Sequence, residues 1–132
     1  MTGGTDLDAL LAGMRPTLAP ETYVFATRPD GTWPDTLRPR MIFHEAEGTT
    51  LVITRSEAEA AGLDHEFPCR MITLDIHSAL HAVGFIARIA TELAAHGMGV
   101  NPVAGFFHDH LFVPEDRAGD AMAILENLSR EG

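Results

Sequence analysis

The chain has 132 residues, of which 45% are hydrophobic, enough for one compact core or two small lobes that share a core. Its formal net charge of −10 disfavours nucleic acids and anionic membranes as partners, since both require a basic surface. A single cysteine, Cys69, excludes an internal disulfide, and no apolar run approaches the roughly 20 residues of a membrane-spanning helix. Because the N-terminus also lacks the features of a signal peptide, we expect a cytoplasmic protein.

The first 40 residues predict a helix, a strand and a long loop. Apolar residues at helical spacing predict a helix over 5–13, and the strong β-formers of 22–27 predict a strand. The prolines within 16–20 predict a break between them. Residues 28–39 contain prolines and an Asp-Gly pair, so we expect an irregular connection there.

The next stretch predicts a hairpin followed by a short helix. Apolar runs at 41–46 and 50–54 are separated by a Glu-Gly pair that suits a tight turn. The helix expected over 55–61 can begin with a cap from Thr54 or from Ser56.

The second half predicts the order strand, helix, strand, strand, helix. Residues 70–77 alternate apolar and polar, whereas 80–96 carry apolar residues at helical spacing. Further strands are expected at 100–107 and 110–113, and a final helix at 115–128. This order is a ferredoxin-like split βαβ unit that lacks its last strand.

Residues 81–85, 93–100 and 103–114 resemble the ACT domain family. In that family a glycine opens the first helix and a Leu-Ala-x-x-Gly segment leads into the second strand. The thirteen-residue step from Gly84 to Gly97 fits this pattern. The segment 103–114 is similar to the second hairpin of small stand-alone bacterial ACT proteins and of tandem-ACT amino-acid sensors.

The resemblance implies an α+β, ferredoxin-like ACT fold with an antiparallel sheet and helices on one face. Two interlocked ACT-like units are expected, a truncated one over 1–66 and a second one over 67–132. In the first unit, the loop at 28–39 would replace the first crossover helix. The implied function is non-catalytic regulatory binding of a small molecule, an amino acid for preference, in a homodimer. The alternatives are a structural homo-oligomerising module without a ligand and a small metal-dependent enzyme.

The expected ligand site centres on Gly84. A glycine near a helix start costs about 1 kcal/mol of helix propensity, and unpaired N–H groups there can bind a carboxylate. The alternative is that Gly84 only allows close packing between the helix and the sheet. Carried over from the resemblance, the ligand-binding residues are Val83, Gly84, Phe85, Asn101, Val103, Gly105, Phe106 and Asp109.

Two other kinds of site are considered and not favoured. The segment His108-Asp109-His110 has ligand types that suit a metal, but we expect it to be a polar hairpin turn and not a metal site. Ser78 or Cys69 could serve as a nucleophile, yet no catalytic signature surrounds either, and Ser78 is explained as a helix cap. We therefore expect no catalytic residue and no cofactor.

Overall fold

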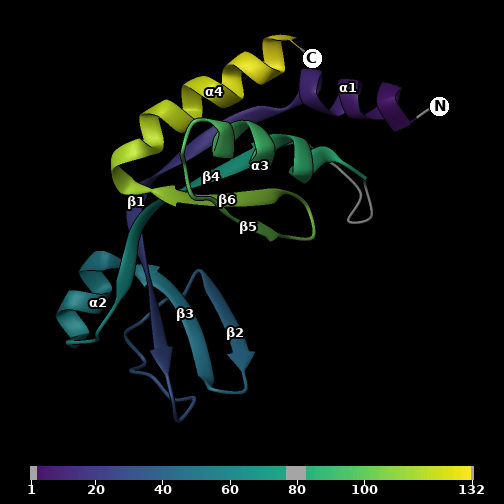
Figure 1. Ribbon diagram of the computed structural model, residues 1–132. Helices are drawn as coiled ribbons and strands as arrows, with labels where there is room; N and C mark the ends of the chain where they lie inside the picture. Colours follow the sequence, from purple (N-terminus) through teal and green to yellow (C-terminus); the bar gives the residue numbers. More distant parts are fainter. Residues whose placement is uncertain (1–2, 77–82, 132) are drawn as a thin grey trace. The chain divides into compact units, whose positions relative to one another are not determined.

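The structure is a computed structural model that describes residues 3–76 and 83–131 (Figure 1). In chain order its elements are α1 (Gly3–Gly13), β1 (Arg15–Arg28), β2 (Met41–Glu45), β3 (Gly48–Thr54), α2 (Arg55–Ala61), β4 (Glu66–Asp75), α3 (Phe85–Ala95), β5 (Asn101–Ala104), β6 (Asp109–Pro114), the short 3₁₀ helix η1 (Glu115–Arg117) and α4 (Ala118–Glu131). Hydrogen bonds join the strands in the order β2-β3-β1-β4-β6-β5. This α+β arrangement confirms the expected fold class. No helix in the described part of the chain has the length and apolar character needed to cross a membrane.

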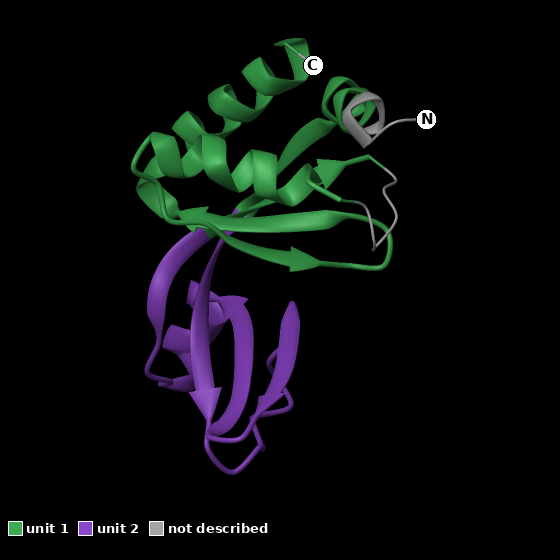
Figure 2. Ribbon diagram, turned by 45° about the vertical axis from the view of Figure 1, so that its right-hand side comes forward, with its two compact units in different colours: residues 1–20, 70–132 green, residues 21–69 purple. Residues whose placement is uncertain are grey.

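Packing divides the chain into two compact units (Figure 2). The first combines residues 1–20 with 70–132 and is called the outer unit, because it contains both ends of the sequence. The second is residues 21–69 and is called the inner unit, because it lies between them in the sequence. The outer unit therefore joins both ends of the chain, while the inner unit is one continuous segment.

The inner unit contains three antiparallel strands in the order β2-β3-β1, and α2 packs against them. Strand β3 pairs with β1 through partners that run from Tyr23 and Thr54 to Arg28 and Thr49, and it pairs with β2 on its other side. Alternate residues of β1 and β3 face α2, as expected for a half-buried sheet. The core formed in this way consists of Val24, Ala26, Leu37, Leu51, Ile53 and Ala58.

In the outer unit α1, α3 and α4 pack together with the apolar faces of β4 and β6. Figure 2 shows α3 and α4 lying together on one face of the strands. Leu74 of β4, Phe85 and Ile89 of α3, Leu111 of β6 and Leu125 of α4 are all 2% exposed or less. The expected helix at 5–13 is confirmed and begins two residues earlier, at Gly3.

Strand β1 is much longer than the sequence predicts. It runs from Arg15 through Pro16 and Pro20, where a break was expected. Proline fixes φ near the value of an extended chain and only removes a donor, so it is tolerated where no ladder bond is needed. The guanidinium of Arg70 also holds this segment, because it donates to the carbonyl of Ala19 at 2.7 and 3.1 Å.

Helix α2 confirms its predicted bounds, whereas the elements of the second half are shifted. Strand β4 begins at Glu66, four residues before the prediction, and the last helical segment begins as the 3₁₀ helix η1. The helix expected over 80–96 begins in the described chain only at Phe85, after Gly84 with φ of +90°. Residues 77–82, including the proposed cap Ser78, lie outside the described residues.

The turn of the second hairpin is not at His108-Asp109-His110. Strand β5 ends at Ala104 and β6 begins at Asp109, so the turn is Gly105–His108 and the two aromatic residues lie in it. The N–H of Gly105 donates to the carbonyl of His108 at 2.9 Å, which closes this turn. The prediction was wrong because aromatic residues favour strands, and it gave Phe106 and Phe107 to β5.

Candidate functional site

Gly84 occupies the position immediately before α3 and not its first turn. Its φ of +90° is a conformation that residues with a Cβ rarely adopt, and its carbonyl accepts the bond from Arg88 N–H at 2.9 Å. A Cβ there would meet only the Leu7 side chain, at an ordinary 3.7 Å, so close packing does not require the glycine. The helix start has no side-chain cap. Val83 is 89% exposed, and Phe85 is 2% exposed.

The predicted residues of the hairpin lie on two faces of the sheet. Val103 pairs with His110 and Asn101 with Phe112, whereas Asp109 pairs with Ala104. Leu111 belongs to the helix-covered core, and alternate residues of a strand share a face, so Asp109 lies on the helix side. Asn101 and Val103 lie on the opposite face. Gly105 and Phe106 are in the turn, and Phe106 is 75% exposed.

The two histidines of the hairpin contact the strand beside it. Nδ1 of His110 lies 3.0 Å from the hydroxyl oxygen of Thr73, and Nε2 of His108 lies 3.8 Å from a carboxylate oxygen of Asp75. Burial raises the pKa of Asp109 above its ordinary value, although the neighbouring imidazoles act in the opposite direction. Within residues 3–76 and 83–131 no group of three or more His, Cys, Asp or Glu side chains could hold a metal ion. That the hairpin is not a metal site stays a prediction.

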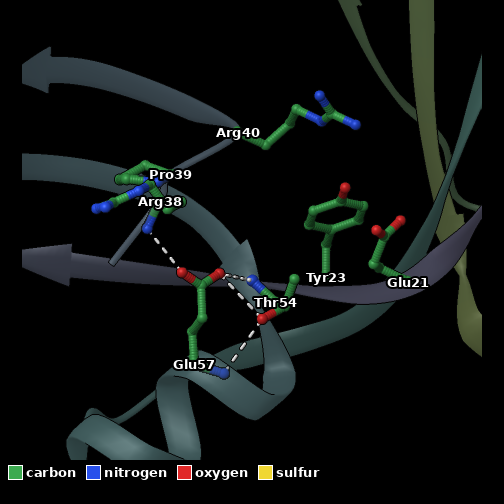
Figure 3. Close-up of a pocket in the computed structure, with 7 residues that line it drawn as sticks. All are labelled: Glu21, Tyr23, Arg38, Pro39, Arg40, Thr54 and Glu57. Carbon is green, nitrogen blue, oxygen red and sulfur yellow. Dashed lines mark hydrogen bonds between the residues drawn. The ribbon is translucent and has the colours of Figure 1, made fainter. Parts of the chain in front are cut away.

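A cleft of about 440 Å³ in the inner unit was not predicted (Figure 3). It is lined by Glu21, Tyr23, Arg38, Pro39, Arg40, Thr54 and Glu57. These residues come from β1, from the loop before β2, from the end of β3 and from the start of α2, so no local motif predicts the cleft. The only signal in the sequence is the Thr-x-x-Glu spacing of Thr54 and Glu57, which is typical of a capping box.

Glu57 fixes one wall of the cleft. The backbone N–H of Glu57 donates to the hydroxyl of Thr54 at 3.1 Å, and the backbone N–H and hydroxyl of Thr54 both donate to one carboxylate oxygen of Glu57 at 3.0 Å. The other carboxylate oxygen accepts the N–H of Arg38 at 2.6 Å. Partial burial acts to raise the pKa of Glu57, but the hydrogen bonds from Arg38 and Thr54 outweigh it and hold the pKa below its ordinary value.

Arg40 and Tyr23 form another wall. The N–H of Arg40 donates to the carbonyl of Val52 at 2.7 Å, which anchors the backbone to β3. Its guanidinium carbon lies 5.8 Å from the centre of the Tyr23 ring, within the range of a cation–π contact. The cleft thus places a cation, an aromatic ring and the carboxylate of Glu21 around one opening (Figure 3).

Antiparallel strands covered by helices, arranged in two compact units, define a ferredoxin-like protein of the α+β class. Residues 2–70 and residues 66–127 match two families that are both described as ACT domain. The chain belongs to the ACT domain family, which confirms the resemblance read from the sequence.

Solved structures of similar fold include one with clear sequence similarity. A Vibrio cholerae protein of unknown function, described as a possible transport protein, is 40% identical with a TM-score of 0.87 over 97% of this chain and 99% of that chain. An Agrobacterium tumefaciens protein is 15% identical with a TM-score of 0.73 over 88% and 89%. The ligand-free regulatory subunit of aspartate kinase from Thermus thermophilus is 10% identical with a TM-score of 0.66 over 89% and 97%. No curated protein matches the chain significantly.

Proposed function

We propose that the protein is a non-catalytic regulatory ACT protein that binds an amino acid. The observation that carries the proposal is the pair of ACT matches, which together span residues 2–127. ACT domains are typically regulatory modules, and the Thermus thermophilus structure of similar fold is a regulatory subunit of aspartate kinase. The proposal keeps the sequence division into repeats of residues 1–66 and 67–132, and it places the protein in the cytoplasm.

The proposed ligand site lies at the start of α3 and along β5. Helix α3 has no side-chain cap at Gly84, so its first N–H groups can receive the carboxylate of an amino acid. Asp109, on the helix side of the hairpin, would hold the cationic group. The remaining residues of the site are Val83, Phe85, Asn101, Val103, Gly105 and Phe106.

We also propose a homodimer. Strand β5 ends the hydrogen-bonded order, so one side of it carries backbone groups that can pair with another chain. Asn101 and Val103 lie on the face of β5 opposite to Asp109. A second copy paired at this edge would let residues from both faces contact one ligand. The interface would use this edge or α3.

Thermal melting with each of the twenty common amino acids tests the proposal. An amino acid at 100 times its dissociation constant should add about 2.7 kcal/mol to the free energy of unfolding. Gly84→Val should abolish this shift, because its side chain would block the helix start.

Gly97→Val is the matched control. Gly97 also has a positive φ, of +72°, and lies just beyond the other end of α3, with no atom within 4 Å of an added Cβ. The control should lose stability and keep ligand binding. A Gly84→Val protein that binds as tightly as the parent would place the site elsewhere. The absence of any shift in the parent would favour the structural module without a ligand.

A further inference from the structure

Two of the four charged side chains that line the inner-unit cleft are occupied by the fold. The guanidinium of Arg38 donates to the carbonyl oxygens of Asp35 and Leu37 at 2.9 and 3.2 Å. The carboxylate of Glu57 accepts bonds from Arg38 and Thr54, as described above. These two charges therefore hold the loop and the start of α2 in place.

The other two charges, on Arg40 and Glu21, are not used in this way. Neither the guanidinium of Arg40 nor the carboxylate of Glu21 makes a hydrogen bond or an ion pair with any residue in the described ranges. Figure 3 shows the two side chains lying to either side of the Tyr23 ring. Opposite charges held near an aromatic ring without pairing directly leave room for a ligand between them.

The base of this arrangement is rigid. Tyr23 is 4% exposed, so its ring is held in place by the residues around it. The backbone N–H of Arg40 donates to the carbonyl of Val52 in β3. Pro39, which comes just before Arg40, has its φ fixed by its ring. The Arg40 side chain is thus fixed where it leaves the backbone and its guanidinium lies over the Tyr23 ring, and the residue as a whole is exposed to solvent. Such a fork binds carboxylates through two parallel hydrogen bonds.

We propose that this cleft is a second binding site, for the zwitterionic backbone of a free α-amino acid. The ligand carboxylate pairs with Arg40, and its ammonium group pairs with Glu21, beside Tyr23. A simple anion would meet the charge of Glu21 and a net charge of −10, and a simple cation would meet Arg40. Only a ligand with both charges satisfies the two side chains. The cleft volume of about 440 Å³ lies within the range of small-molecule sites, roughly 300–1,000 Å³.

This site is independent of the one proposed at α3. All its residues lie within 21–69, whereas the other site lies within 83–109. Binding in the cleft can therefore occur whether or not the α3 site exists, and the two can be tested separately in one protein.

The test is an amide-resolved NMR titration of the full chain with each of the twenty common L-amino acids. At least one should shift the amides of Arg40 and Thr54, while acetate and methylammonium at the same concentration should not. Arg40→Gln and Glu21→Gln should each weaken this binding at least tenfold. Arg28→Gln should leave it unchanged, because the Arg28 guanidinium is bonded to the Thr32 carbonyl at the other end of β1.

Several results would overturn the inference. They are the absence of cleft shifts with every amino acid, binding of acetate as tight as that of the amino acids, and normal binding by both charge variants. Since the Glu21 side chain is exposed and its carboxylate bonds to no described residue, Glu21→Gln gives a folded variant even if Arg40→Gln does not. Shifts confined to the amides of Val83–Phe85 would refute the cleft and support the α3 site. Shifts confined to the cleft would do the reverse.

Discussion

The carboxylate of Glu57 connects the loop before β2 to the start of α2, and its removal should destabilise the inner unit. Glu57→Gln keeps the shape of the side chain but replaces one acceptor oxygen by an amide group that cannot accept from Arg38 N–H. A bond from a neutral donor to a charged acceptor contributes about 1.5–3 kcal/mol. Because Glu57 is partly solvent-exposed, we expect a loss of about 1–2 kcal/mol in the free energy of unfolding, similar to the loss of a helix cap.

The single tryptophan gives a local assay. Trp33 packs against the core of the inner unit, so its fluorescence during urea unfolding reports on the unit that Glu57 supports. Glu59→Gln, an exposed carboxylate on the same helix, is the matched control and should change the midpoint little. If Glu57→Gln and Glu59→Gln unfold at the same urea concentration, the hydrogen bonds around Glu57 contribute nothing measurable and the reasoning is refuted.

The pH dependence follows from the same hydrogen bonds. Because the folded-state pKa of Glu57 is lowered, its contribution is complete above the ordinary carboxyl pKa and is lost as the pH falls through the folded-state pKa. The parent protein should therefore lose stability in this acid range more steeply than Glu57→Gln, in which the group does not titrate. Equal slopes would contradict the lowered pKa.

Three further predictions test other parts of the molecule. Asp109→Asn should stabilise the outer unit at neutral pH, because the raised pKa of the Asp109 carboxyl means that the folded state disfavours its charged form. This gain in stability should shrink as the pH falls through the folded-state pKa. Melting curves at several pH values measure it, with the exposed Asp116→Asn as control. Leu125→Ala should cost about 2–5 kcal/mol of unfolding free energy, since the Leu125 side chain is fully buried, and Leu125→Met should cost less than about 1.5 kcal/mol; equal losses in chemical unfolding would argue against tight packing of α4. Sedimentation at micromolar concentration should give twice the chain mass of 14.3 kDa, and a monomer would contradict the proposed dimer.

Local chemistry could be predicted wherever the deciding residues are neighbours in sequence. Helix α2 has its predicted bounds because Thr54 and Glu57 cap its start and Gly62, with φ of +68°, ends it. The expected order of strand, helix, strand, strand, helix followed in the same way from changes of apolar period and from glycines at helix ends, and the ACT fold followed from the resemblance of residues 81–85, 93–100 and 103–114.

Features that depend on distant residues could not be predicted. The first part of β1 is held by Arg70, which lies 51 positions from Ala19, and nothing near Pro16 indicates that the chain stays extended. The inner-unit cleft likewise combines Tyr23, Arg40 and Glu57 from separate elements. The hairpin turn was misplaced because strand propensity of the aromatic pair was given more weight than the Gly105 that precedes it.

The two glycines that suggested a ligand site have reasons of their own in the backbone. Gly84 is required by a φ of +90°, and a Cβ at Gly105 would come within 2.9 Å of the carbonyl oxygen of His108. Both positions need glycine with or without a ligand, so substitution there changes the fold and the proposed site together. Arg40 and Glu21 are different, because neither side chain makes a hydrogen bond or an ion pair in the described part of the chain, although the Arg40 guanidinium lies over the Tyr23 ring. A loss of binding in Glu21→Gln would therefore reflect the ligand alone, which makes the cleft the more decisive place to test whether this protein senses amino acids.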